Sequence, residues 1–252
     1  MDTETTGLEY SKDRIIQLSY ILSDEEFKII EGKNFYLNVD ENIPKQVTQI
    51  HKIDNKKLLE LSGGKKFEDH AKEILWDFQD SKVICHNTEF DINFLEEEFR
   101  RLGKSVYINK KFCTMNNYTD IVNIGHSYYG QKWPKLEEVA NYLKLDMEEL
   151  KTAAAEVFGE VGDFHDSRLD VYTTYIIYMK FKSDVIKNYL NKLKTDVDIL
   201  EQGTLSNITL ESMSDNVKAL RNIEIAISRF EGEGSGEDMN AFRYIDDDDI
   251  PF

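Results

Sequence analysis

The chain is poor in cysteine and in long apolar runs. Only two cysteines occur among 252 residues, Cys85 and Cys113, and nothing in their use indicates an oxidising compartment. Cys85 follows Val83 and Ile84 in a short apolar run, which favours a buried small hydrophobe over a disulfide partner. No apolar run is long enough to span a bilayer, and the first residues carry no basic-then-apolar signal. We therefore expect a cytoplasmic protein with no membrane segment.

Basic residues are also scarce. Lysine and arginine total 31 against 48 acidic residues, which gives a net charge of −17. Because non-specific affinity for nucleic acid comes mainly from Lys and Arg, this balance argues against a generic polyanion binder. It leaves room for an enzyme that grips one strand end, since divalent ions reverse the sign of an acidic site. One basic cluster either touches a phosphate backbone or forms a solvated helix end: Arg100, Arg101, Lys104, Lys110 and Lys111.

Three segments far apart in the chain are rich in acidic residues and histidine: Asp2 to Gly7, His86 to Asp91 and His165 to Asp170. Residues two apart on a strand project from the same face, so the carboxylates of Asp2 and Glu4 lie together. Asp91 and Asp170 would add further oxygen ligands, which suit Mg²⁺ or Mn²⁺. Converging carboxylates repel one another unless cations neutralise them, so the set predicts a metal site for two-metal phosphodiester hydrolysis.

The motifs resemble those of the DEDDh 3′–5′ exonucleases, the family of the proofreading subunit of bacterial replicative polymerase, ribonuclease T and oligoribonuclease. Asp2 and Glu4 match its D-x-E-T-T-G motif, His86 to Asp91 match H-N-x-x-F-D, and His165 with Asp170 matches H-x4-D. The resemblance covers residues 1–182. It implies a ribonuclease H-like α/β fold, in which helices flank a mixed central sheet. It also implies hydrolysis of single-stranded 3′ ends to nucleoside 5′-monophosphates.

The resemblance further implies a role for each matched residue. Asp2, Glu4, Asp91 and Asp170 would hold two Mg²⁺ or Mn²⁺ ions. His165 would be the general base, because an unperturbed imidazole pKa of about 6.5 suits proton removal at neutral pH; a capping or core histidine is the alternative. The residues expected to cradle the terminal nucleotide, support its pocket or contact its base are Thr5, Thr6, Gly7, Leu8, His51, Asn87 and Phe90. For His51 a plain surface histidine is the alternative.

Hydrophobic periodicity independently predicts an α/β chain. Branched and aromatic residues over 15–22 and 28–39 flank the polar segment 23–26, which predicts a hairpin. A short buried strand is expected over 83–85. Apolar residues at helical spacing predict further elements, namely helices over 67–78, 90–102 and 136–145 and a long helix from about residue 166.

Three parts are expected along the chain. Residues 1–182 form the exonuclease domain, 183–230 a helical extension, and 231–252 a flexible tail rich in Gly, Ser and acid. The helical patterns of the extension fit either a cover for the first domain or a dimer contact, so the oligomeric state stays open. Family members place an apolar strand before the first motif, whereas only Met1 precedes Asp2 here. We therefore expect an apolar, branched stretch upstream of Met1.

The last seven residues resemble the acidic tip of bacterial single-stranded-DNA-binding protein. They are Asp246, Asp247, Asp248, Asp249, Ile250, Pro251 and Phe252. In such a tip the terminal Phe fills an apolar pocket, its carboxylate meets an Arg, and the Asp run lies on a basic ridge. The resemblance implies partners among replication and repair proteins that bind this tip, and a bacterial or phage origin. The alternative is an inert solubilising tail.

Three functions follow from these patterns. The first is a 3′–5′ exonuclease acting on single-stranded DNA in replication or repair, which the tip favours. The second is an exoribonuclease of the same chemistry, because no residue in the sequence distinguishes the 2′-hydroxyl. The third is a non-catalytic adaptor that recruits repair proteins through its tail. The intact carboxylates and His165 argue against the adaptor, which needs none of them.

Overall fold

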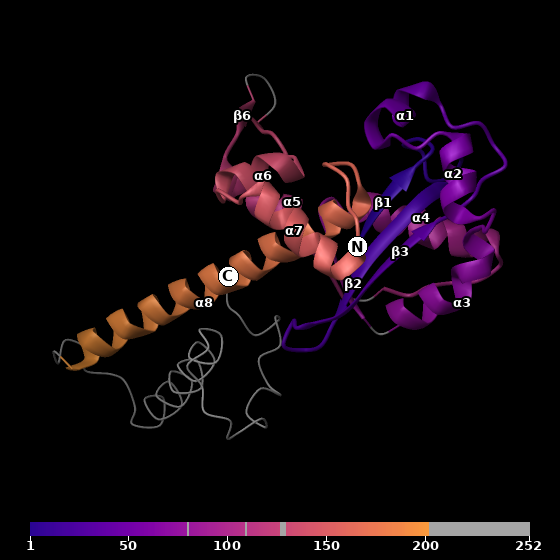
Figure 1. Cartoon of the computed structure of the whole chain (residues 1–252). Coiled ribbons are helices and arrows are strands. Elements are labelled where there is room, and N and C mark those ends of the chain that lie inside the picture. The colour runs from indigo at the N-terminus through magenta and orange to yellow at the C-terminus, as the bar shows by residue number, and fades with distance from the viewer. Residues whose placement is uncertain (80, 109, 127–129, 202–252) are drawn as a thin grey trace. The chain divides into compact units, whose positions relative to one another are not determined.

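The computed structural model describes residues 1–79, 81–108, 110–126 and 130–201 (Figure 1). The helical pattern over 210–230, the tail and its tip lie outside the described residues. The chain divides into two compact units, Met1–Met179 and Lys180–Phe252. The boundaries expected after residues 182 and 230 stay predictions.

The mixed α/β fold is confirmed, and most expected elements are present. The strands are β1 (Asp2–Thr5), β2 (Ile15–Ser23), β3 (Ile29–Tyr36), β4 (Lys82–Cys85), β5 (Lys110–Cys113), β6 (Gly125–His126) and β7 (Gly130–Gln131). The helices are α1 (Lys45–His51), α2 (Asn55–Ser62), α3 (Phe67–Phe78), α4 (Thr88–Arg101), α5 (Thr114–Val122), α6 (Leu136–Tyr142), α7 (Met147–Phe158) and α8 (Ser167–Glu201).

Strands β1, β2 and β3 form an antiparallel sheet in that order, and β4 pairs with β5 in parallel. In β1, Asp2 faces Ser19 and Glu4 faces Gln17, but the register shifts between Glu4 and Thr5. The α-amino group of Met1 donates a hydrogen bond of 2.8 Å to the carbonyl of Ile84 in β4. The beginning of β1 therefore lies beside β4.

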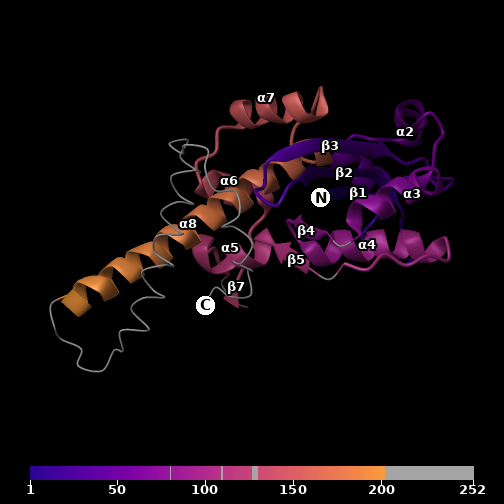
Figure 2. The same cartoon turned by 90° about the horizontal axis from the view of Figure 1, so that it is seen from below.

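The central strand β2 divides an apolar core from a polar layer. On one face, Leu18 and Tyr20 pack in a buried cluster with residues of α3 and α4. Figure 2 shows these two helices beside the sheet. On the other face, the Ser19 hydroxyl lies 2.5 Å from that of Ser167, at the start of α8. Because successive strand residues point to opposite faces, β2 joins the core to the helix that carries the third motif. Cys85 lies in the same core, as predicted.

Helix α7, which the periodicity did not single out, packs against β3. Gly32 in β3 makes this close approach possible, because a Cβ there would lie 2.4 Å from Cγ1 of Val157. Among the helices in the described part of the chain, none is both long and apolar enough to cross a membrane.

Candidate active site

Three elements bring the carboxylates of the motifs together. Asp2 and Glu4 lie on β1, whereas Asp91 and Asp170 each lie in the first turn of a helix, α4 and α8. The residues leading into these helices, Asn87 and His165, have positive φ angles of 79° and 69°. Asn and His are among the residues that most readily adopt this left-handed conformation, which turns the chain sharply into each helix.

The tightest group consists of Glu4, His165 and Asp170. One side-chain ligand atom from each lies within 4.8 Å of the other two. Asp2 and Asp91 are close enough to Glu4 and Asp170 for their charges to interact. The structure thus brings all five predicted catalytic residues into one neighbourhood. Of these five, Glu4, His165 and Asp170 have ligand atoms within 4.8 Å of one another.

Burial and mutual repulsion make these carboxylates reluctant to ionise. Burial, followed by repulsion from Asp170 and Asp91, raises the pKa of Glu4 to about 9. Burial likewise raises the pKa of Asp170 to about 8 and that of Asp91 to about 7. The pKa of Asp2 is raised well above its usual range by burial and by the same neighbours. A bound cation would reverse this penalty, since it favours the charged forms.

The donors fit a hard divalent cation. The Oδ2 atom of Asp170 accepts a hydrogen bond of 3.1 Å from the backbone N–H of His165. Its Oδ1 atom is buried and has no hydrogen-bond partner among the described residues. A buried polar oxygen without a partner is costly, so this atom is suited to coordinate a cation, which would also favour the ionised carboxylate. All four carboxylates offer oxygen, which matches Mg²⁺ and Mn²⁺.

Thr3, which sequence analysis did not select, orients one of these carboxylates. Its hydroxyl donates a buried hydrogen bond of 2.9 Å to Oδ1 of Asp91, and this bond partly offsets the pKa increase of Asp91. The sequence contained one indication of this role, because Thr3 lies between two candidate metal ligands on the same strand. Groups that orient metal ligands in this way often matter nearly as much as the ligands themselves.

Asp166 was also missed, and it fixes the turn that carries His165. Arg168 donates to it twice, from Nε at 2.8 Å and from Nη2 at 2.6 Å, and the backbone N–H of Gly162 donates at 2.8 Å. Burial alone would raise the pKa of Asp166, but these donors hold it below its usual range. An Arg two residues after an Asp at a helix start was the signal in the sequence.

His86, the first residue of the second motif, joins this site to the segment before α6. Its Nδ1 lies 2.9 Å from the hydroxyl of Thr114, and its Nε2 lies 2.9 Å from the carbonyl of Pro134. Burial lowers the pKa of His86 to about 4, so the ring is neutral at neutral pH. Glu137, in the first turn of α6, contributes to the raised pKa of Asp170, so the start of α6 lies near the carboxylates. Trp133, in the segment before α6, is 68% exposed although it is large and aromatic.

The expected substrate-binding residues border the same region. His51 is buried, and its Nδ1 accepts a hydrogen bond of 3.1 Å from the backbone N–H of Ile53. Burial lowers the pKa of His51 to about 4, and His165 adds to the effect. The neutral ring therefore carries its proton on Nε2. This atom makes no hydrogen bond of good geometry with the described residues, although the backbone of Thr5 lies close enough to affect the pKa of the ring.

The remaining expected contacts differ in exposure. Thr5 and Thr6 are buried, and the Thr5 hydroxyl donates to the carbonyl of Gly7 at 2.5 Å. Leu8 is 81% exposed, although it is a large apolar residue. The other two expected substrate-binding residues lie at the start of α4. Asn87 is exposed, and Phe90 packs on Phe94 with ring centroids 4.8 Å apart.

Comparisons with known proteins agree with this geometry. Residues 1–178 match the family model described as Exonuclease (RNase T). DNA polymerase III subunit epsilon of Rickettsia felis is 30% identical over 149 residues, which cover 58% of this chain and 62% of the relative. The subunit epsilon of Buchnera aphidicola subsp. Baizongia pistaciae is 24% identical over 242 residues, 89% of this chain and 91% of the relative.

Solved structures show the same fold. E. coli Exonuclease I in complex with a dT13 oligonucleotide aligns with a TM-score of 0.58 and 19% identity, over 75% of this chain and 42% of that chain. A structure described as an ExoI/SSB-Ct complex aligns with a TM-score of 0.56 and 19% identity, over 78% and 44%. With a family model that matches most of its length, the chain belongs to the exonuclease family.

Proposed function

We propose that the chain is a divalent-metal-dependent 3′–5′ exonuclease that removes nucleoside 5′-monophosphates from single-stranded DNA. The observation that carries the proposal is the group of Glu4, His165 and Asp170, whose ligand atoms lie within 4.8 Å of one another in an exonuclease fold. The partnerless Oδ1 of Asp170 adds support, because it suits a cation.

In this proposal Asp2, Glu4, Asp91 and Asp170 hold two Mg²⁺ or Mn²⁺ ions. When bound, such ions activate a water and stabilise the leaving 3′-oxygen. His165 would accept the proton of the attacking water, because its side chain is exposed and lies beside Glu4 and Asp170. Its backbone N–H also holds the Asp170 carboxylate, so the base and one ligand are positioned together.

The terminal nucleotide would lie against the segment Thr5 to Leu8. Leu8 offers an exposed apolar side chain on which a base can pack. His51 would offer its buried Nε2–H to a nucleotide oxygen in place of the backbone of Thr5. Asn87 and Phe90 line or support the other side of this pocket in the proposal.

DNA is favoured over RNA as the substrate. The relatives are named as subunits of DNA polymerase III, and a structural neighbour was solved with dT13. The aligned part is 62% of the first relative, so the substrate is argued from likeness and from the site together. An exoribonuclease of the same chemistry is the alternative.

Labelled oligomers test this proposal directly. Single-stranded DNA and RNA of equal sequence, each labelled at the 5′ or the 3′ end, would be incubated with Mg²⁺, Mn²⁺ or EDTA. We expect metal-dependent release of the 3′ label as a mononucleotide and a ladder from the 5′ label, faster for DNA. Faster digestion of RNA would select the alternative substrate, and an inert chain with intact fold would select the adaptor.

Site variants provide the second arm. Asp2→Ala, Glu4→Ala, Asp91→Ala and Asp170→Ala should each abolish turnover. His165→Ala should slow hydrolysis by roughly 10²–10⁴-fold and leave metal binding intact. Glu89→Gln is the matched control, because Glu89 is an exposed acid two residues before Asp91. Near-normal activity of His165→Ala across neutral pH would exclude its role as the base.

We also propose that the C-terminal tip docks on proteins that bind the tip of single-stranded-DNA-binding protein. The support is the run Asp246 to Asp249 followed by Ile250, Pro251 and Phe252, together with the existence of an ExoI/SSB-Ct complex among the structural neighbours. Because the chain has a net charge of −17, its own surface is a poor binding site for the acidic tip, which favours docking on another protein.

Removal of the tip tests this docking. The full chain, a deletion of residues 246–252 and Phe252→Ala would be compared for binding to the Exonuclease I of that complex. We expect salt-sensitive binding by the full chain that both changes abolish, with an unaltered rate on short oligomers. Equal binding by all three would exclude the docking tip. A several-fold faster rate after deletion would instead identify the tail as an autoinhibitor.

A further inference from the structure

The segment between β1 and β2 forms a closed loop, which we call the Leu8 loop (residues 6–14). At its base, the backbone N–H of Thr6 donates to the carbonyl of Arg14 at 2.9 Å, and the N–H of Arg14 donates to the Thr6 hydroxyl at 3.0 Å. Inside the loop, Oδ2 of Asp13 accepts from the N–H of Glu9 at 2.8 Å. The same carboxylate fills the space over Gly7, where a Cβ would lie 2.3 Å from it.

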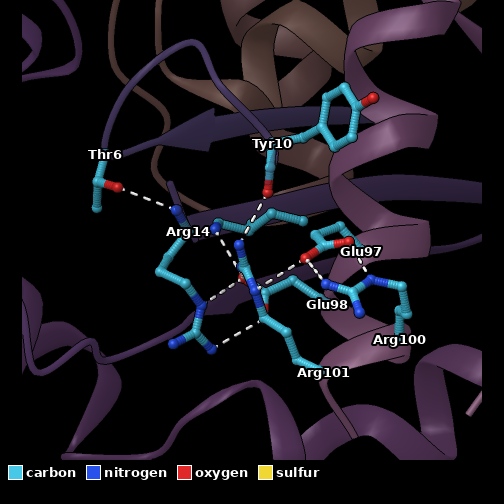
Figure 3. Close-up of polar contacts among 8 residues, drawn as sticks. Thr6, Tyr10, Arg14, Glu97, Glu98, Arg100 and Arg101 are labelled. Atoms are coloured by element: carbon cyan, nitrogen blue, oxygen red, sulfur yellow. Dashed lines mark hydrogen bonds and ion pairs between the residues drawn. The ribbon is translucent and has the colours of Figure 1, made fainter. Parts of the chain in front are cut away.

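A buried carboxylate on α4 holds the base of the Leu8 loop. Glu98 has a side chain that is 1% exposed. It accepts hydrogen bonds from Nε and Nη2 of Arg14 at 2.8 and 2.9 Å and from the N–H of Ile15 at 3.2 Å (Figure 3). Two parallel bonds between a guanidinium and a carboxylate fix orientation as well as distance. The start of β2 is thus attached rigidly to α4.

A second arginine extends this attachment to the outer part of the loop. Nη1 of Arg101 donates to Glu98 at 3.0 Å, and Nη2 donates to the carbonyl of Tyr10 at 2.8 Å (Figure 3). The ring of Tyr10 meets Phe94 of α4 edge-on, with centroids 6.4 Å apart. Helix α4 therefore contacts the loop at its base and near its tip, and Glu98 joins the two arginines.

The helix that holds the loop also carries Asp91. Glu98 lies seven residues after it, which is two turns or about 10 Å along the helix and on the same face. The position of Leu8 relative to the candidate metal ligands is therefore set through one rigid element. Leu8 itself is 81% exposed, so burial of its side chain in the core does not hold the loop in place.

We infer that Glu98 is a positioning residue: through Arg14 and Arg101 it holds the Leu8 loop at a fixed distance from Asp91, and so sets how tightly the terminal nucleotide is gripped. The inference rests on the proposed exonuclease function. Glu98 touches neither the substrate nor the ions in this scheme. Its loss should weaken the grip on the strand end more than it slows the bond-breaking step.

The test compares Glu98→Gln with Glu97→Gln in the full chain. Glu97 is the neighbouring buried carboxylate on α4, but it pairs with Arg100 at 2.6 Å and lies 3.4 Å from Nε of Arg101, without contact to the loop. Both changes remove one charge and keep the side-chain size. Three kinds of measurement would be made on each: amide hydrogen exchange by mass spectrometry, Mn²⁺ affinity by calorimetry, and steady-state kinetics on a single-stranded DNA oligomer, which give kcat and KM.

For Glu98→Gln we expect amide exchange over residues 6–14 to accelerate about tenfold, while the first two turns of α4 keep their protection. We expect KM to rise about tenfold, with kcat and Mn²⁺ affinity changed less than about threefold. Glu97→Gln should leave all of these values near those of the parent. A loop whose exchange is unchanged would overturn the inference, and so would a looser loop with an unchanged KM.

A second pair keeps the test decisive if Glu98→Gln fails to fold. Arg101→Gln frees the carbonyl of Tyr10 and leaves the bonds between Arg14 and Glu98 intact, whereas Arg100→Gln makes the same charge change one residue away. Arg101→Gln should raise KM, and Arg100→Gln should not. If the parent hydrolyses no oligomer, the proposed function fails. The exchange comparison then decides by itself whether Glu98 anchors the loop.

Discussion

The hydroxyl of Thr3 donates a 2.9 Å hydrogen bond to the carboxylate of Asp91, which joins β1 to the first turn of α4 across 88 positions of sequence. This bond turns one carboxylate oxygen toward the strand that carries Asp2 and Glu4. It also lowers the pKa of Asp91 against the larger effect of burial. Thr3 thus acts on the candidate metal site without being a ligand.

Thr3→Val should therefore weaken the site while keeping the strand. Valine has the same shape, but it leaves the Asp91 oxygen without its donor, so the pKa of Asp91 should rise and metal should bind less well at neutral pH. We expect Mn²⁺ affinity or activity to fall about 10–100-fold, as for other groups that orient ligands. Thr3→Ser keeps the hydroxyl and is the control. Calorimetric Mn²⁺ affinity of Thr3→Val equal to that of the parent would contradict this role.

The raised carboxylate pKa values predict how stability depends on pH and on metal. Without metal, the folded chain holds protons on Asp91, Asp170 and Glu4 up to pH values of about 7, 8 and 9, whereas the unfolded chain has lost them. The folded state then binds more protons, so stability falls as pH rises through this window. We expect the thermal midpoint in EDTA to fall between pH 7 and pH 9.

Divalent metal should remove this dependence, because it stabilises the ionised carboxylates. Thermal midpoints with Mg²⁺ should exceed those in EDTA, by more at pH 9 than at pH 7. Asp170→Asn should reduce the pH dependence in EDTA, and Glu89→Gln should leave it unchanged. Midpoints that are identical with and without metal at pH 9 would argue against a cation at these carboxylates.

Asp166→Asn tests the turn that carries His165. The change weakens the paired bonds from Arg168, so His165, the proposed base, loses its fixed position. Because small misplacements of a reacting group slow catalysis strongly, we expect kcat to fall about tenfold or more with little change in Mn²⁺ affinity. Arg168→Gln breaks the same pair. The double variant should therefore be no slower than the slower single variant, and additive losses would show that the two residues act separately.

Gly32→Ala tests the packing of α7 on β3. The new Cβ would lie 2.4 Å from Val157 and 2.9 Å from Phe158, so one element must shift. Overpacking of this kind costs about 1–3 kcal/mol in the free energy of unfolding, which urea titration measures. Gly125→Ala is the control, because among the described residues, its two chain neighbours aside, no atom lies within 4 Å of the added Cβ. Val157→Ala in the Gly32→Ala background should recover part of the loss.

The local pattern of apolar residues predicted those helices and strands that bury one apolar face. The helix over 67–78 coincides with α3, and the hairpin over 15–22 and 28–39 contains β2 and β3. The short α1 and α2 and helix α7 were not predicted. Their positions depend on contacts with distant strands, such as that of Gly32 with Val157, which no local period reveals.

The motif residues were predicted from their order, but their supports were not. Glu98 follows two other acids, which is typical of a solvated helix face, and Arg100 and Arg101 looked like a surface basic cluster. The structure buries Glu98 because Arg14, 84 positions earlier, neutralises it. The spacing of seven from Asp91 was a signal that Glu98 shares the buried face. Its partner becomes evident only when the strands are assembled.

The closure of the Leu8 loop at Thr6 and Arg14 makes the strand pairing that positions Asp2 and Glu4 independent of the residues inside the loop. The backbone pair between these residues lies directly after the point where Thr5 pairs with Ile15, so the register of β1 on β2 is settled before the loop begins. Residues can then be inserted or exchanged between Gly7 and Asp13 without sliding Asp2 and Glu4 along the sheet. Under the proposed function, changes in the loop would alter which strand ends bind while Asp2 and Glu4 keep their positions.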